Sequence, residues 1–198
     1  MITSLGNRLA HVLALSGAVP EDEQKLYSYG FFLLLSKGLF LVVTVAFGAM
    51  WGVLWESIAF HALFALLRGY AGGIHASRES VCLFWTTVAM LFSTGIIRWL
   101  TVPGRGAAAL GLLLAGLAGI ALFSPLDTPE KPLDPEYRKS YRRRSLTVAL
   151  GAAGVALVSA ALGWFVPLAI TAPAMALEAL LLSAGKVDAR KSTKMQEK

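Results

Sequence analysis

Long apolar stretches alternate with short polar segments along the chain, and this pattern predicts its main elements. A helix needs about 20 mostly apolar residues to cross a lipid bilayer. The pattern therefore predicts an all-α, multi-pass transmembrane protein with about six membrane spans, and five is the alternative count. The expected spans lie near residues 31–50, 52–67, 81–99, 106–123, 146–164 and 166–183. The first two are poorly separated, whereas Gly163, Trp164 and Pro167 mark a tight turn between the last two.

The segments around these spans divide the chain. Residues 1–27 place apolar side chains at helical spacing and predict an amphipathic helix at the membrane interface. Residues 28–185 form one membrane-embedded domain, and residues 186–198 form a basic cytoplasmic tail. Within the domain, residues 124–145 hold four prolines and a run of cations, which predict an extended basic loop. That loop suits either attachment to anionic lipids or docking of a charged partner.

Composition and charge support a membrane protein. Hydrophobic residues make up 56% of the chain and charged residues 15%, against about 45–50% and 25% in soluble domains. The net charge of +6 comes from cations beside apolar stretches, without a nucleic-acid-binding motif, so we expect no nucleic-acid partner. Small residues are concentrated at 106–122, and they favour close packing between helices.

The distribution of lysine and arginine predicts the orientation. With six spans, the N-terminal segment, the loop near residues 68–80, the 124–145 loop and the tail lie on one side of the membrane. These segments hold most of the cations, while the loops on the opposite side hold only Arg98 and Arg105. Because cytoplasmic loops are enriched in lysine and arginine, both termini and the loop near residues 68–80 should be cytoplasmic.

One short segment offers a nucleophile and a base close together in the sequence. Cys82 is the sole cysteine, and His75 lies seven residues before it. On one straight helix the two side chains would be about 10 Å apart along the axis, which is too far for direct proton transfer. The glycines at 69, 72 and 73 argue against such a helix. We therefore expect His75 on a bent loop and Cys82 on a helix that begins near Ser77.

Other interpretations remain open from the residues alone. A single buried cysteine is more often a packing residue than a nucleophile. A small multi-pass transporter or a membrane scaffold without enzymatic activity is the alternative, with His61 and Lys37 as its polar groups. The chain lacks H-E-x-x-H and G-x-S-x-G motifs, and its acids lie in loops rather than in pairs within spans. We accordingly expect no metal and no other cofactor.

Two motifs carry a resemblance to a known family. The stretch R-G-Y-A-G-G-I-H-A, with Cys82 seven residues after the histidine, resembles the accessory gene regulator protein B (AgrB) family, the membrane peptidases of bacterial peptide quorum sensing. The loop S-P-L-D-T-P-E-K-P-L and the basic run R-K-S-Y-R-R-R-S are also similar to that family. The resemblance covers most of residues 1–185. It implies that His75 and Cys82 are catalytic and that Arg68, Gly72 and Gly73 shape the site or bind substrate.

The resemblance also implies an activity and its partners. The protein would be a cysteine endopeptidase that removes the C-terminal tail of a short amphipathic, AgrD-like signal propeptide. A Cys82 acyl-enzyme thioester would then allow cyclisation to a thiolactone autoinducing peptide. The implied location is the bacterial plasma membrane, with the active site at the cytoplasmic face. The implied partners are anionic lipids of the bilayer and a second copy of the chain in a homodimer.

Overall fold

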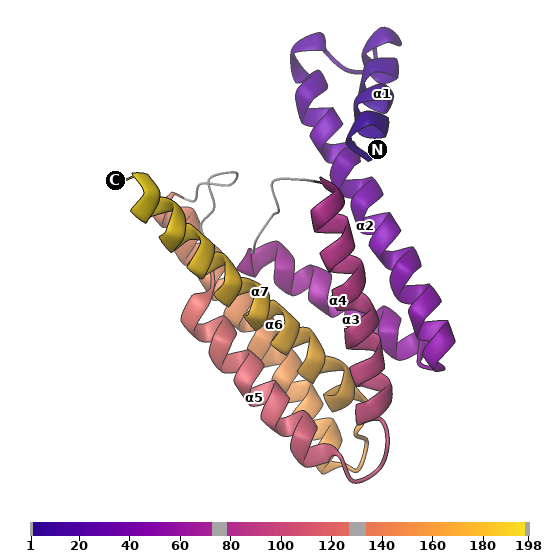
Figure 1. Cartoon of the computed structure of the whole chain (residues 1–198), viewed down its shortest axis with the longest axis vertical. Coiled ribbons are helices and arrows are strands. Elements are labelled where there is room, and N and C mark those ends of the chain that lie inside the picture. The colour runs from indigo at the N-terminus through magenta and orange to yellow at the C-terminus, as the bar shows by residue number, and fades with distance from the viewer. Residues whose placement is uncertain (1, 73–78, 127–133, 197–198) are drawn as a thin grey trace.

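The computed structural model describes residues 2–72, 79–126 and 134–196, and this part of the chain is all helical (Figure 1). The predicted all-α fold class is therefore confirmed. A short 3-10 turn, Glu21–Glu23, precedes the second α-helix. The α-helices are α1 (Ile2–Leu15), α2 (Gln24–Trp51), α3 (Leu54–Ala71), α4 (Glu79–Leu100), α5 (Gly106–Phe123), α6 (Pro135–Ala161) and α7 (Val166–Gln196).

Five of these helices are long and apolar enough to cross a membrane, so the multi-pass character is confirmed as well. The five candidate spans are Gln24–Trp51, Leu83–Leu100, Gly106–Phe123, Glu136–Ala161 and Val166–Val187. The segment expected as the second span, residues 52–67, corresponds to α3, which is not among the five. Glu56, His61 and Arg68 lower the apolar character of α3. One face of α3 is nevertheless buried inside the bundle.

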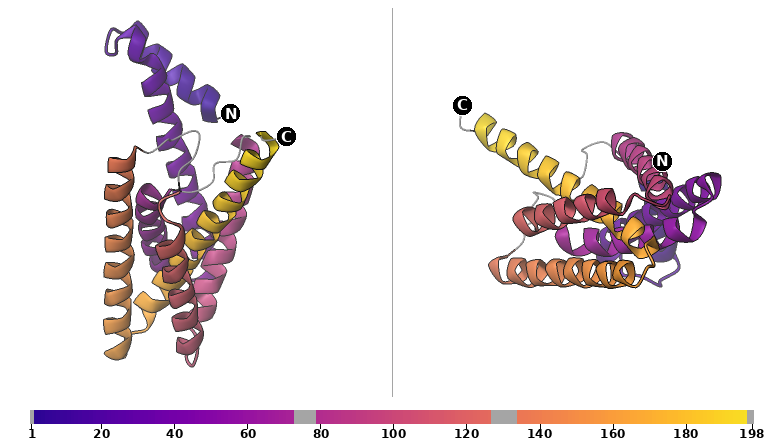
Figure 2. Two further views of the ribbon diagram at one scale, coloured as in Figure 1. Left: turned by 90° about the vertical axis from the view of Figure 1, so that its left-hand side faces the viewer. Right: turned by 90° about the horizontal axis from the view of Figure 1, so that it is seen from below.

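Helix α7 lies at the centre of the packing and contacts α3, α4, α5 and α6 (Figure 2). Its closest partner is α5, because glycines let the two backbones approach. A Cβ atom added at Gly116 would lie 2.6 Å from the Ala176 nitrogen, and one added at Gly119 would lie 2.5 Å from the Ala179 Cβ. Without a hydrophobic force between helices in lipid, such close packing is what holds spans together. The predicted role of the small residues at 106–122 is confirmed.

Helix α1 and the first part of α2 form a hairpin that projects from the rest of the bundle, whereas the remainder of α2 packs on α3 and α4 (Figure 1). Gly6 and Ala10 of α1 are buried against α2. A Cβ atom at Gly6 would lie only 3.1 Å from the Ser28 carbonyl oxygen. The helix expected within residues 1–27 is thus present, and its outer side chains Leu5 and Val12 remain exposed. Its placement at the membrane interface stays a prediction.

The prediction of an extended loop over residues 124–145 is wrong for the second half of that segment. Helix α6 begins at Pro135, so the basic run forms its first turns and continues into the apolar part of the helix. Proline is favourable at the first helical position, because the missing N–H group would have no partner there and the fixed φ suits a helix. The other three prolines precede the helix and do not interrupt it. The expected tail from residue 186 likewise continues α7 as far as Gln196.

Candidate functional site

The end of α3 is fixed by Gly72. This residue has a φ of 80° and a ψ of −158°, and its N–H group donates to the Arg68 carbonyl oxygen at 3.2 Å. The N–H group of Leu126 donates to the Ala71 carbonyl oxygen at 2.9 Å. A Cβ atom at Gly72 would lie 2.9 Å from the Leu126 carbonyl oxygen. Glycine is therefore required here both for its positive φ and for the close approach of another backbone segment.

A bend was predicted from Gly69, Gly72 and Gly73, and in the structure α3 ends at Gly72. Gly69 lies inside α3, where an added Cβ atom would meet nothing within 4 Å. The expectation that Gly69 argues against a helix is therefore wrong. The cost of one glycine in a helix interior is about 1 kcal/mol, and the buried face of α3 outweighs it. Gly73 lies outside the described residues.

Arg68 lies one turn before the end of α3 and contacts Gly72. Its side chain is half-buried, and Nη1 donates to the Gly72 carbonyl oxygen at 3.3 Å. The backbone carbonyl of Arg68 accepts the Gly72 N–H group as well. The structure thus brings together two of the predicted site residues, Arg68 and Gly72. Arg68 bonds to both the N–H and the carbonyl group of the residue at which α3 ends.

Cys82 lies on the first turn of α4, which begins at Glu79. Helices α3 and α4 are separate and run in different directions (Figure 1). The described residues before and after this segment therefore belong to two different helices. His75 and the helix start expected near Ser77 lie outside the described residues. The pairing of His75 with Cys82 stays a prediction.

The start of α6 and the end of α5 meet the end of α3. The Ser124 and Ser145 hydroxyl groups are buried and 2.6 Å apart. Arg142 Nη2 donates to the Ala121 carbonyl oxygen at 3.2 Å, which ties α6 to the last turns of α5. These bonds hold the 124–126 segment, which carries Leu126, against the end of α3.

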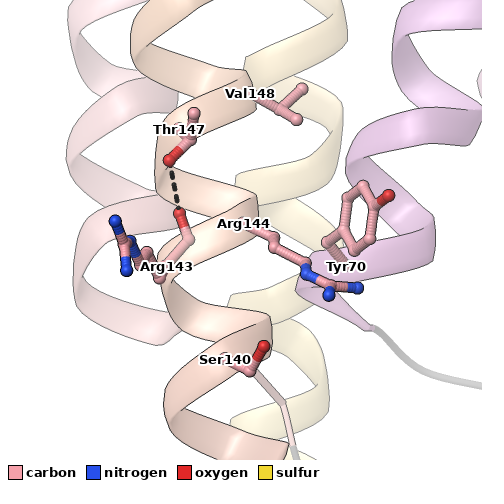
Figure 3. Close-up of a pocket in the computed structure, with 6 residues that line it drawn as sticks. All are labelled: Tyr70, Ser140, Arg143, Arg144, Thr147 and Val148. Atoms are coloured by element: carbon pink, nitrogen blue, oxygen red, sulfur yellow. Dashed lines mark hydrogen bonds between the residues drawn. The ribbon is translucent and has the colours of Figure 1, made fainter.

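A shallow basic pocket lies between α3 and α6, beside this junction (Figure 3). The Arg144 guanidinium carbon lies 5.9 Å from the centre of the Tyr70 ring, and in Figure 3 the side chain extends toward that ring. The pocket has a volume of about 440 Å³ and contains two arginines and no acid. Its lining residues are Tyr70, Ser140, Arg143, Arg144, Thr147 and Val148. The charge and position of the pocket suit an anionic group near the end of α3.

His61, the other histidine considered in the spans, has a structural contact. Its Nδ1 lies 3.2 Å from the Thr44 hydroxyl oxygen, which itself donates to the Phe40 carbonyl oxygen at 2.7 Å. Thr44 is fully buried between α2 and α3. His61 therefore links these two helices, and this contact accounts for a polar side chain at that depth.

Glu178 is a residue that the sequence interpretation missed. It lies within the α7 span, so the expectation that the acids lie in loops is wrong for this residue. Its side chain has no exposed surface, and neither carboxylate oxygen has a hydrogen-bond partner in the described part of the chain. The sequence did contain a signal for Glu178: an acid inside an apolar, membrane-spanning stretch is by default a candidate for a functional role.

Comparison with known proteins agrees with this architecture. The family model described as Accessory gene regulator B matches residues 6–183. A protein of Listeria monocytogenes serotype 4a (strain HCC23), named AgrB-like, is 27% identical over 157 residues, covering 78% of this chain and 76% of the relative. AgrB-like protein 2 of Clostridium perfringens (strain 13 / Type A) is 21% identical over 154 residues, covering 73% and 70%. No solved structure matches the chain significantly.

Proposed function

The chain belongs to the accessory gene regulator B family, and from this membership we propose that it is a membrane cysteine endopeptidase for a small signal propeptide. The observation that carries the proposal is the extent of the family match, residues 6–183. The match includes the segment with the sole cysteine and a histidine seven residues before it.

The proposed reaction begins with proton transfer from the Cys82 thiol to the His75 imidazole. The thiolate attacks the carbonyl carbon of the peptide bond between the signal region and the C-terminal tail. The histidinium then donates its proton to the tail nitrogen as the C–N bond breaks. The tail leaves with a free amine, and the signal region remains on Cys82 as a thioester.

The second step closes the ring of the signal peptide. A side-chain thiol of the bound propeptide attacks the thioester carbonyl and forms a thiolactone, and the Cys82 thiol is regenerated. One thioester replaces another, so the energy of the acyl bond is conserved. Hydrolysis would release a linear peptide, and a site that excludes water prevents this loss. The product is the autoinducing peptide of a bacterial quorum-sensing system.

Residues around the bend have supporting roles in this proposal. Arg68, Gly72 and Gly73 shape the segment that carries His75. Cys82 lies near the N-terminal end of α4, and the first N–H groups of a helix have no carbonyl partner within it. These N–H groups are suited to stabilise the negative oxygen that develops on the attacked carbonyl.

The proposed setting is the cytoplasmic face of the bacterial plasma membrane. The cations in the first turns of α6, at the start of a candidate span, favour contact with anionic lipid headgroups. The amphipathic propeptide would lie on the same leaflet, within reach of the site. A homodimer is part of the proposal through family membership alone.

Release of the propeptide tail tests the proposal. The chain is co-expressed with a short AgrD-like propeptide, and tail release is followed by mass spectrometry. We expect Cys82→Ala and His75→Ala to abolish release, and Cys82→Ser to impair it severely, because a hydroxyl is a far weaker nucleophile than a thiolate at neutral pH.

A control variant and a trapped intermediate make this test more specific. His61→Ala is the matched control, since His61 bonds to Thr44 and has no role in the proposed reaction. A propeptide–enzyme adduct that hydroxylamine cleaves would support the thioester directly. Cleavage by both the Cys82→Ala and the His75→Ala variants would show that the mechanism is wrong.

A further inference from the structure

The last carbonyl groups of α3 accept hydrogen bonds from donors that a continuing helix would not use. We propose that Leu126 is a positioning residue for the peptidase site, whose backbone N–H group caps α3 and thereby keeps His75 from joining that helix. This inference rests on the proposed function, because it concerns how His75 reaches Cys82. It adds the 124–126 segment, which is far from His75 in the sequence, to the determinants of the site.

The bond from Leu126 takes the place of a helical bond from His75. In an α-helix, each carbonyl oxygen accepts the N–H group of the residue four positions later. If α3 continued past its last residue, the Ala71 carbonyl oxygen would therefore accept the His75 N–H group. In the structure this oxygen accepts the Leu126 N–H group at 2.9 Å. A carbonyl at the end of the helix, which otherwise has no partner, is thus satisfied by a distant segment.

Gly72 needs these contacts, because glycine alone does not end a helix. Glycine adopts helical and positive φ angles about equally readily, and here φ is 80°. The Leu126 carbonyl oxygen lies so close that a Cβ atom added at Gly72 would be 2.9 Å from it. The Gly72 carbonyl oxygen also has a donor, Arg68 Nη1, at 3.3 Å. Leu126 therefore contacts the chain on both sides of the Ala71–Gly72 peptide bond and favours the non-helical conformation.

Two buried hydroxyl groups hold the capping segment in place. The Ser124 and Ser145 oxygens are 2.6 Å apart, and both residues are buried. Ser145 donates its proton to the Arg142 carbonyl oxygen at 3.0 Å, so the Ser124 hydroxyl is the donor within the pair. A buried hydroxyl without its partner is costly. Because Ser124 lies two residues before Leu126, this bond fixes the capping segment to α6.

Loss of the cap should therefore affect the chemical step more than substrate affinity. Without the Leu126 donor, the Ala71 carbonyl can accept the His75 N–H group, and α3 can extend by a turn. On one continuous helix the His75 and Cys82 side chains would be about 10 Å apart along the axis. The imidazole and the thiol would then meet less often in the reactive geometry. Substitution at Leu126 leaves the charges around the site as they are.

The test compares two substitutions of Leu126 in the full-length chain, in vesicles of phosphatidylglycerol and phosphatidylethanolamine. Leu126→Pro removes the N–H group, whereas Leu126→Ala keeps it and removes most of a side chain that packs against the core. The kcat for propeptide tail release should fall about 10- to 100-fold in Leu126→Pro, with KM nearly unchanged. Leu126→Ala should lower the melting temperature and retain kcat.

The reactivity of Cys82 gives a second measurement that a purely structural role would not change. Cys82 is the sole cysteine, so alkylation by iodoacetamide reports on that thiol alone. In the wild type, pairing with His75 should allow alkylation well below the pKa of about 8.5 of a free thiol. In Leu126→Pro the pH profile should shift toward that of His75→Ala. In Leu126→Ala it should stay as in the wild type.

Ser145→Ala tests the same segment without a change in the backbone. It removes the acceptor of the buried Ser124 hydroxyl, so kcat should fall about 3- to 10-fold and the alkylation profile should shift in the same direction as in Leu126→Pro. Ser183→Ala is the matched control. Ser183 is exposed and donates only within its own helix, to the Leu180 carbonyl oxygen at 2.8 Å. It should leave both measurements unchanged.

The inference would be overturned by wild-type kcat and alkylation profile in Leu126→Pro, or by equal losses of kcat in Leu126→Pro and Leu126→Ala. Ser145→Ala that behaves as Ser183→Ala would also overturn it. If Cys82→Ala and His75→Ala cleave normally, the proposed function itself fails. If those two are inactive while Leu126→Pro behaves as wild type, only the positioning role fails.

Discussion

Gly72 is constrained both by its backbone conformation and by a neighbouring backbone segment. A Cβ atom there would lie 2.9 Å from the Leu126 carbonyl oxygen, on a backbone with a positive φ of 80°. We expect Gly72→Ala to lower the melting temperature and to reduce propeptide cleavage at least tenfold, because both the strain and the clash displace the bend. Thermal unfolding in detergent and tail release are the measurements.

Gly69→Ala is the control for this prediction. Gly69 is on the same helix, three residues earlier, with nothing within 4 Å of an added Cβ atom. Alanine should stabilise α3 there by about 0.5–1 kcal/mol through its better helix propensity, and cleavage should be unchanged. A Gly72→Ala protein with wild-type stability and activity would contradict the assigned role of Gly72.

Residues differ in how far the sequence reveals their roles. Gly72 was predictable, because glycines beside a histidine and a cysteine indicate a bend between two helices. Gly69 was misjudged, because its small local cost is outweighed by the buried face of the helix. The burial of Glu178 lies beyond local reasoning, since it follows from the packing of α7 against helices that are far from it in the sequence.

Helix α5 shows how one element depends on its small residues. Gly116 faces α7 with no room for a side chain, since an added Cβ atom would lie 2.6 Å from the Ala176 nitrogen. Gly111, on the same helix, has nothing within 4 Å. We expect Gly116→Val to separate α5 from α7 and to destabilise the protein by about 1–3 kcal/mol or more. Gly111→Val should have a much smaller effect on stability.

Thermal unfolding in detergent, followed by size-exclusion chromatography, measures this difference. Valine has the same helix propensity at both positions, so a difference between the two variants reports on packing against α7. Equal losses of stability would show that the close contact between α5 and α7 is unimportant.

The positions of the helices could be predicted from the sequence where hydropathy alone determines where a helix begins and ends. The spans near 106–123 and 166–183 correspond to α5 and to the apolar part of α7. The start of α6 was not predictable in this way, because proline has opposite effects at different positions. Pro135 begins the helix that the prolines were expected to prevent.

At the scale of the whole molecule, the polar connections meet at one end of the bundle. In Figure 1, α4 and α6 begin in the upper half, and α3 and α5 end near mid-height. The short connections at residues 101–105 and 162–165 lie in the lower half. This arrangement agrees with the cation distribution, which was used to place the loop near residues 68–80 and the termini on the same side.

The number of crossings depends on α3. Its 18 residues extend about 27 Å at 1.5 Å per residue, close to the thickness of about 30 Å of a hydrocarbon core. Its polar side chains face protein: His61 contacts Thr44, and Arg68 contacts Gly72. Polar residues in spans are tolerated when they face the interior of a bundle. We therefore expect α3 to cross the membrane as a sixth span, with both termini in the cytoplasm.

Cysteine labelling in intact bacteria tests whether α3 crosses the membrane. In a Cys82→Ser background, single cysteines replace Ser16, Val102 and Val187, all exposed in the structure. A membrane-impermeant maleimide should label Val102→Cys in intact cells, because the 101–105 connection faces outward. Ser16→Cys and Val187→Cys should react only after permeabilisation. Labelling of Val187→Cys but not of Ser16→Cys in intact cells would mean an odd number of crossings, and α3 would then lie within the bundle without spanning the bilayer.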